Sequence, residues 1–149
     1  MNNKGFSLIE LIVVIVVAAI ATSMGIISYN IVNSRNVQKA AKNFEKSVDE
    51  ARTVSMAKGT ANGILTLHYE GNILYCGVNG TEREICNGQV GVFINGVTVQ
   101  VPSGTTISFN TAGQATSTIN DLYFLRGQKG CKVTLNKIAG KAETTYYSH

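Results

Sequence analysis

The sequence predicts an α+β fold in which one long N-terminal helix packs against a C-terminal antiparallel β-domain. Residues 11–34 form a run of 24 residues without a charge, and residues 35–58 continue with apolar side chains at every third or fourth position. From Gly59 onward the chain holds 13 of its 15 glycines and four Asn-Gly pairs, which are typical of hairpin turns. A length of 149 residues is enough for one domain with an appendage.

The composition excludes several common classes of protein. With 44% hydrophobic and 15% charged residues and a net charge of +4, the chain is too apolar to be disordered. Two histidines and three cysteines, with no Cys-x-x-Cys or His-x-x-x-His pattern, do not supply the ligands of a structural zinc site. No glycine-rich phosphate loop precedes a helix. We therefore expect no metal and no cofactor.

The apolar run predicts a membrane segment. Residues 11–21 are apolar without interruption, and about 20 such residues span the roughly 30 Å hydrocarbon core of a bilayer. Residues 6–32 are the expected transmembrane segment, and Lys4 places the N-terminus in the cytoplasm. The alternative is a secretory signal peptide cut after Ala21. Glu10 argues against it, because an unpaired carboxylate entering lipid costs about 2–3 kcal/mol.

The helix is expected to continue to Lys58 and to end at Gly59, without an intervening proline. Over residues 6–58 it would be roughly 80 Å long. Its second half is amphipathic, with charged residues on the outer faces. The face expected to pack on the β-domain consists of Val37, Ala41, Phe44, Val48, Ala51 and Ser55.

Residues 59–149 are expected to form a globular β-domain of seven to nine antiparallel strands. Alternating patterns predict strands at 65–69, 97–101, 105–109 and 131–135. Residues 73–78, 90–94 and 122–125 are apolar enough for strands covered on both faces. No strand–helix–strand repeat occurs, so a parallel nucleotide-binding sheet is not expected.

The N-terminus carries a specific motif. Residues 4–10, Lys-Gly-Phe-Ser-Leu-Ile-Glu, lead directly into the apolar helix. This pattern resembles the class III signal of type IV pilins and pseudopilins. The resemblance implies that a prepilin peptidase removes the leader, residues 1–5, by cutting between Gly5 and Phe6, and methylates the new amine of Phe6. Many type IV pilins carry a proline at the position of Ile27. This chain has no proline there, so Gly25 is the one residue of this stretch that weakens the helix.

Glu10 is the candidate residue for filament assembly. Cleavage creates a positive amine at Phe6, four residues before Glu10. In apolar surroundings each charge is costly alone and less costly when paired. Pairing of one subunit's amine with Glu10 of a neighbour would favour one axial register. The alternative is that Glu10 reaches the lipid headgroups and has no role in assembly.

Parts of the remaining chain resemble minor pilins and pseudopilins of the FimT/GspH type. These parts are residues 50–59, 106–114 and 131–140. The resemblance implies a subunit that initiates or caps a type IV pilus or a type II secretion-like pseudopilus. Implied partners are other pilin subunits, the prepilin peptidase, the inner-membrane assembly platform and, before assembly, the bilayer. The precursor would reside in the inner membrane, and the assembled subunit in a surface filament. A major pilin or adhesive subunit is the alternative.

An extracytoplasmic domain allows disulfides. Cys76 and Cys86 flank a glycine-containing loop, and a bridge between them would close a ring of about ten residues worth roughly 2–3 kcal/mol. Cys131 belongs to an inward-facing set and is expected to be a buried thiol. A bridge involving Cys131, or three reduced thiols, are the alternatives.

A second function class is nucleic-acid binding. Five cations near the C-terminus have no acid among them: Arg126, Lys129, Lys132, Lys137 and Lys141. Some FimT-like minor pilins of DNA-uptake systems bind DNA through basic residues near the C-terminus. Residues after the helix carry six Lys or Arg against five Asp or Glu, and Glu143 follows the cluster closely. The alternative is that these lysines are solvated and guard a strand edge.

An enzyme is the third class. His68 is expected on the polar face of its strand without a carboxylate partner, and His149 is the last residue. The serines lack a nucleophile-elbow context. We therefore expect a non-catalytic structural protein.

Overall fold

Helix α1 (Leu8–Lys58) ends where the sequence predicts. The computed structural model describes residues 7–96 and 99–148, without the side chains of residues 24–28 and 30. The Gly59 amide donates to the Ser55 carbonyl at 3.0 Å, and Gly59 has φ +92°. A glycine with positive φ after the last helical turn is a common helix stop, because it has no Cβ to resist this conformation. The chain divides into two compact units, residues 1–32 and 33–149.

In the first unit, the described side chains of α1 from Leu8 onward are exposed. Leu8 is 76% exposed and Ile9 is 69% exposed. Among the described residues no helix combines the length and the apolar character that crossing a membrane requires. The transmembrane segment at residues 6–32 stays a prediction from the sequence. Gly25 and Ile27 lie outside the residues whose side chains are described.

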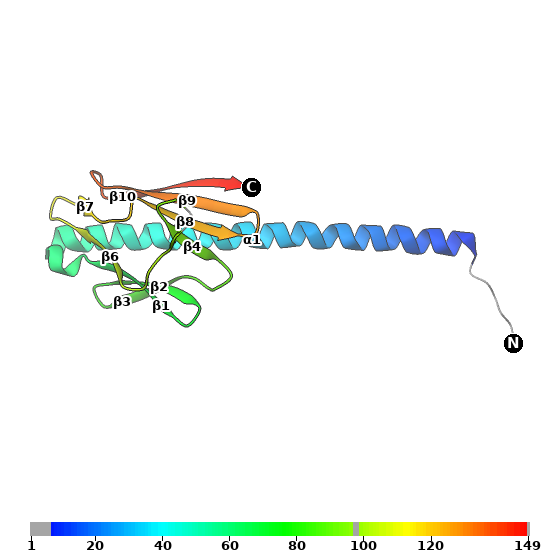
Figure 1. Ribbon diagram of the computed structural model, residues 1–149, viewed down its shortest axis with the longest axis horizontal. Coiled ribbons are helices and arrows are strands. Elements are labelled where there is room, and N and C mark those ends of the chain that lie inside the picture. The colour runs from blue at the N-terminus through cyan, green and yellow to red at the C-terminus, as the bar shows by residue number, and fades with distance from the viewer. Residues whose placement is uncertain (1–6, 97–98, 149) are drawn as a thin grey trace. The chain divides into compact units, whose positions relative to one another are not determined.

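In the second unit, the described residues form two five-stranded antiparallel sheets (Figure 1). The first sheet has the order β3-β2-β1-β6-β7, and the second has the order β10-β9-β8-β4-β5. A short 3-10 helix, η1 (Thr60–Asn62), connects α1 to β1. The strands are β1 (Leu65–Glu70), β2 (Ile73–Val78), β3 (Thr81–Cys86), β4 (Gly91–Ile94), β5 (Val99–Gln100), β6 (Thr105–Phe109), β7 (Ala115–Thr116), β8 (Asp121–Arg126), β9 (Lys129–Asn136) and β10 (Lys141–Ser148).

Every described part of the seven predicted strands lies in or directly beside an observed one. Val97 and Thr98 lie outside the described residues, so the strand predicted at 97–101 is represented by the two residues of β5. The expectation that residues 73–78, 90–94 and 122–125 are covered on both faces is wrong, because no two neighbouring residues of β2, β4 or β8 are buried. The described residues form ten strands, one more than the seven to nine expected, and β3, β7 and β10 lie outside the predicted ranges. In β3, residues 81–84 are polar and are not buried.

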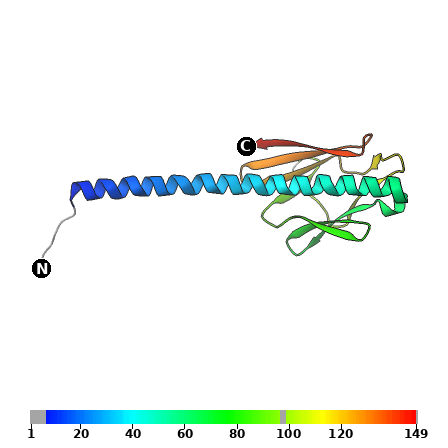
Figure 2. The same cartoon turned by 180° about the vertical axis from the view of Figure 1, so that it is seen from behind.

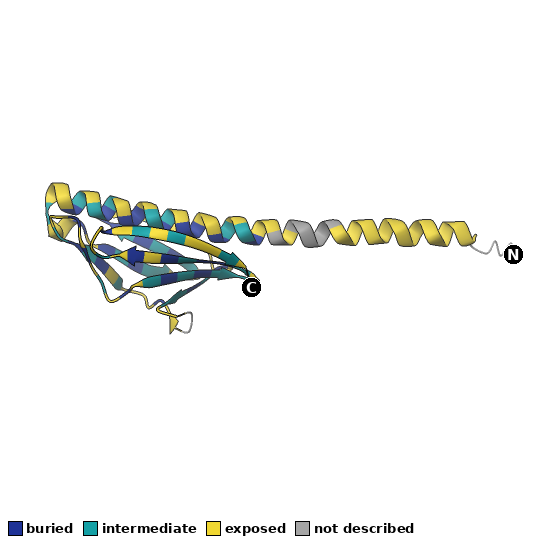
Figure 3. Cartoon of the chain, turned by 90° about the horizontal axis from the view of Figure 1, so that it is seen from above, coloured by how far each residue is buried: buried dark blue, intermediate teal, exposed yellow. Residues whose placement is uncertain are grey.

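One apolar core joins the helix to both sheets. The face predicted for α1 is confirmed: its six residues, Val37, Ala41, Phe44, Val48, Ala51 and Ser55, are all buried. Phe44 lies beside Phe124 of β8, with ring centroids 6.2 Å apart. Figure 3 shows the buried positions of this part of α1 on the side that faces the strands. Small residues fill much of this face, which lets the strands approach the helix closely.

Polar contacts fix the helix against both sheets. On the first sheet, the Ser55 hydroxyl donates to the Phe109 carbonyl at 2.5 Å, and Arg83 of β3 pairs with Glu50 at 2.9 Å. On the second sheet, the Thr144 hydroxyl of β10 donates to Glu45. In the reverse view of Figure 2, strands lie on both sides of this half of α1. The helix therefore lies along the seam between the sheets.

Two of the four Asn-Gly pairs form left-handed turns. Asn79 and Gly80, between β2 and β3, have φ +49° and +80°, as the hairpin prediction requires. Asn95 and Gly96 also have positive φ. The other two pairs are not hairpin turns: Asn62-Gly63 ends η1, and Asn87-Gly88 connects the two sheets.

The expected bridge between Cys76 and Cys86 is not formed in the structure. Cys76 lies opposite Arg83, because the two-residue turn at Asn79 and Gly80 pairs Val78 with Thr81, and Cys86 lies opposite Leu74. All three cysteines are free and buried. Burial raises the pKa of the Cys76, Cys86 and Cys131 thiols from 9.0 to about 12. The structure thus has the three-thiol alternative, with Cys131 buried as predicted.

Gly140→Ala is expected to destabilise the domain more than Gly71→Ala. Both glycines have positive φ, +61° and +58°. An added Cβ would lie 1.8 Å from the Gly113 carbonyl oxygen at position 140 but would meet nothing within 4 Å at position 71. The strain of a left-handed alanine, about 1–2 kcal/mol, is common to both variants. Urea unfolding of the full chain in detergent measures the difference, and equal losses would contradict the packing at Gly140.

The three thiols are expected to resist alkylation at about pH 8 in the folded chain and to react after denaturation, since only thiolates react. The pKa of these thiols is 9.0 in the unfolded chain and about 12 in the folded chain, so the folded state keeps their protons to a higher pH. The free energy of unfolding should therefore fall as pH rises from about 9 to about 12. Recovery of a linked Cys76–Cys86 peptide by non-reducing mapping would contradict this thiol state.

Candidate functional site

Glu10 lies in the first turn of α1 and contacts the residue that precedes the helix. The Ser7 amide donates to Oε2 of Glu10 at 3.0 Å. This contact is half of a capping box, in which an acidic side chain at the third helical position accepts a hydrogen bond from the backbone amide of the residue before the helix. The signal Ser-x-x-Glu at residues 7–10 is present in the sequence, but this local role was not predicted. Gly5 and Phe6, the predicted cleavage and methylation residues, lie outside the described residues.

The five C-terminal cations do not form one patch. Arg126 and Lys129 pair at the turn between β8 and β9, whereas Lys141 pairs with Asn136 at the other end of β9. Seven residue steps along a strand separate these ends by about 24 Å. Lys137 follows β9 at the second end. A nucleic-acid surface built on all five residues is therefore not what the fold assembles.

Lys132, in the middle of β9, already has a partner. Its ammonium lies 3.2 Å from a carboxylate oxygen of Asp121, and it lies 5.8 Å from the ring centroid of Tyr123. The hydrogen bond to Asp121 raises the pKa of Lys132. The other oxygen of Asp121 accepts a hydrogen bond from Thr134 at 2.9 Å. Lys132 is thus held within the sheet and is less available to a phosphate.

A different set of cations does share a surface. Arg35, Lys39, Lys42 and Lys46 follow one another on α1 at intervals of four, three and four residues, and all are exposed. At 100° per residue they fall within an arc of about 60°. Like charges at this spacing destabilise a helix by about 0.2–0.5 kcal/mol per pair. We name these four residues the helix cation row. Their spacing is visible in the sequence, which predicts only that they lie on the outer faces of the helix.

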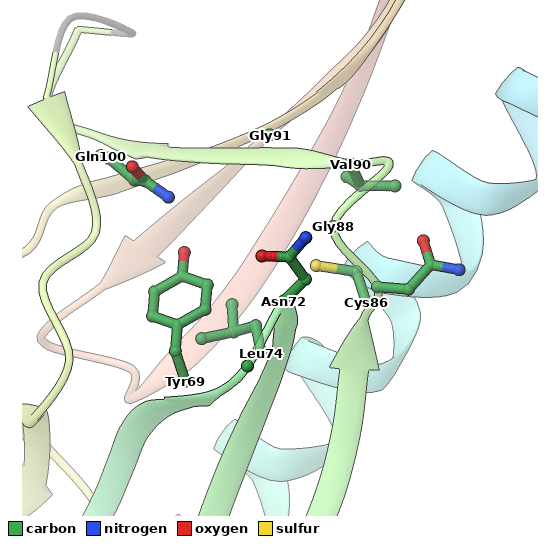
Figure 4. Close-up of a pocket in the computed structure, with 10 residues that line it drawn as sticks. Tyr69, Asn72, Leu74, Cys86, Gly88, Val90, Gly91 and Gln100 are labelled. Atoms are coloured by element: carbon green, nitrogen blue, oxygen red, sulfur yellow. The ribbon is translucent and has the colours of Figure 1, made fainter.

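A cavity of about 240 Å³ lies beside the turn between β1 and β2 (Figure 4). Its side chains are neutral: Tyr69, Asn72 and Gln100 contribute polar groups, and Leu74 and Val90 contribute apolar ones. The buried Cys86 thiol also lines it, and its raised pKa keeps it protonated near neutral pH. These lining residues offer no general acid or base for that pH range.

His68 has the carboxylate neighbour that the sequence did not predict. Its Nε2 lies 3.4 Å from Oε1 of Glu82, and its ring stacks on Tyr75 with centroids 5.7 Å apart. The contact arises because β1 and β3 both pair with β2. The side chains of His68 and Glu82 are 31% and 59% exposed, so water screens their interaction.

Comparison with known proteins assigns the N-terminus. Residues 1–26 match the family model described as the prokaryotic N-terminal methylation motif. No curated protein and no solved structure matches the chain. The motif points to a structural subunit rather than an enzyme. Residues 1–26 therefore carry a class III prepilin signal of the type IV pilin and pseudopilin type.

Proposed function

We propose that the chain is a minor subunit of a type IV pilus or a type II secretion-like pseudopilus, and that it initiates or caps filament assembly. The match of residues 1–26 to the methylation motif carries the assignment to a pilin-type filament. The resemblance of residues 50–59, 106–114 and 131–140 to FimT/GspH-type subunits supports the minor role. A major or adhesive subunit is the alternative.

Processing is the first step of the proposal. A prepilin peptidase cuts after Gly5 and methylates the amine of Phe6, and the subunit then joins other pilin subunits at an inner-membrane assembly platform. Before assembly, the precursor is held at the inner membrane by the apolar residues 6–32, with its N-terminus in the cytoplasm. The prepilin signal and the apolar sequence of residues 6–32 support this anchoring.

The exposed apolar residues of α1 supply the surface for assembly. Ten residues from Leu8 to Val17 include nine large hydrophobic ones that are at least 49% exposed, with Glu10 as the exception. Such a surface is too apolar to remain in water, because burial of each large side chain contributes about 1.5–3 kcal/mol. Helices of neighbouring subunits would cover it in the filament.

Glu10 would exchange partners during assembly. In the single chain its carboxylate accepts from the Ser7 amide, one residue from the future amine of Phe6. The amine of the same chain therefore competes with the amine of a neighbour. Packing of the apolar helices would favour the ion pair between Glu10 and the amine of the neighbouring subunit. It removes Glu10 from water, which strengthens that pair.

Mass spectrometry of the mature chain tests the processing step. The expected N-terminus is Phe6 carrying one methyl group. A chain that begins at Thr22 would contradict the proposal in favour of a secretory signal peptide. The abundance of the chain relative to the main subunit of sheared filaments tests its minor role, since a stoichiometric amount would indicate a major subunit.

Two substitutions at Glu10 separate charge from capping. Glu10→Gln keeps an acceptor oxygen for the Ser7 amide and removes the charge, whereas Glu10→Ala removes both. If the charge selects the filament register, both variants are expected to reduce incorporation into sheared filaments by tenfold or more, which corresponds to at least about 1.4 kcal/mol.

Retention of incorporation by Glu10→Gln, with loss by Glu10→Ala, would contradict the charge role and leave capping as the function. The mass of the mature N-terminus is the control for both variants, because a chain that is not cut after Gly5 could fail to assemble for that reason alone.

A further inference from the structure

We infer that the helix cation row, Arg35, Lys39, Lys42 and Lys46, binds the phosphate backbone of a nucleic acid. All four side chains are exposed, and they follow one helix face for about 16 Å. Together with Gln38 and Asn43 they line a shallow groove of about 310 Å³. This surface is distinct from the C-terminal cations, which the fold distributes to both ends of β9.

The charges of this row are not neutralised by the domain. Among the described residues, no carboxylate lies within ion-pairing distance of any of the four cations. Glu45, on the same helix, is turned to the second sheet, where it accepts from Thr144. Glu84 shares a crevice with Lys39 but makes no ion pair with it. Asp49 and Glu50, the acids that follow the row on α1, fall about 20° outside its arc, one on each side.

The spacing fits a linear polyanion better than a point anion or a flat surface. A single phosphate could contact two adjacent cations and would leave the others repelling one another. An anionic bilayer in contact with one end of the row would reach few of the four cations, since the row extends about 16 Å along the helix, or about two Debye lengths of about 8 Å at physiological salt. A nucleic-acid strand, with a phosphate every 3.4 Å along its axis, can follow all four.

Fluorescence anisotropy of a labelled, mixed-sequence DNA duplex tests this site, with the full chain in a non-ionic detergent. Four phosphate contacts predict a salt slope of about −3.6, so affinity should fall about 150-fold between about 50 and 200 mM salt. For Lys39→Gln with Lys42→Gln, the slope should fall to about −1.8 and the loss to about 12-fold. Lys39→Arg with Lys42→Arg should restore the original slope.

Lys137→Gln with Lys141→Gln is the matched control, because it removes the same charge near the far end of β9. Its salt slope should remain unchanged. The proposal is overturned if the full chain does not bind the duplex, if the control lowers the slope as much as the helix variant, or if only vesicles of anionic lipid are bound. Thermal unfolding of each variant confirms that the compared chains are folded. None of these outcomes depends on filament assembly.

Discussion

The burial of one face of α1 constrains the rest of the unit of residues 33–149. Two sheets share a single core only because a third element fills the space between them, and that element is the helix. Phe44 supplies the bulk at the centre, and alanines and serines supply the close approach on either side. Since buried hydroxyls need partners, Ser55 is tied to the Phe109 carbonyl and cannot shift along the sheet.

The acidic and the basic residues of α1 outside this buried face make different contacts. Glu45 and Glu50 turn toward strands and take part in fixing them. The helix cation row makes no ion pair with a described residue, although Lys39 shares a crevice with β3. The surface of α1 at the helix cation row is therefore positively charged, although residues after the helix carry nearly balanced charge.

Much of the fold could be predicted because periodicity records burial. The face from Val37 to Ser55 and the inward set Cys131, Val133 and Leu135 were both identified from spacing. Strand β3 could not be, because an edge strand beside the helix buries only its last two residues and shows almost no alternation. The predicted Cys76–Cys86 bridge is inconsistent with the hairpin turn at Asn79-Gly80, because a two-residue turn there places Cys76 opposite Arg83.

The site residues divide in the same way. A local motif indicates Glu10 as a site residue, and its contact with Ser7 follows from helix capping, which is also a local signal in the sequence. The dispersal of Arg126, Lys129, Lys137 and Lys141 could not be foreseen, because it depends on which residues of β8 and β10 lie opposite β9. Cations three or four residues apart in the sequence lie close together on a helix face, whereas cations spread along an extended strand lie far apart.

Strand β10 is a long edge strand of the second sheet. Its eight residues pair with β9 on one side, and Lys141, Glu143 and Thr145 alternate outward along it. Two copies brought edge to edge would have to desolvate these charges and match their register, so accidental sheet growth between copies is discouraged. For a protein whose proposed task is to polymerise, this matters: growth by strand addition would yield disordered aggregates, whereas growth through the helix can yield an ordered fibre.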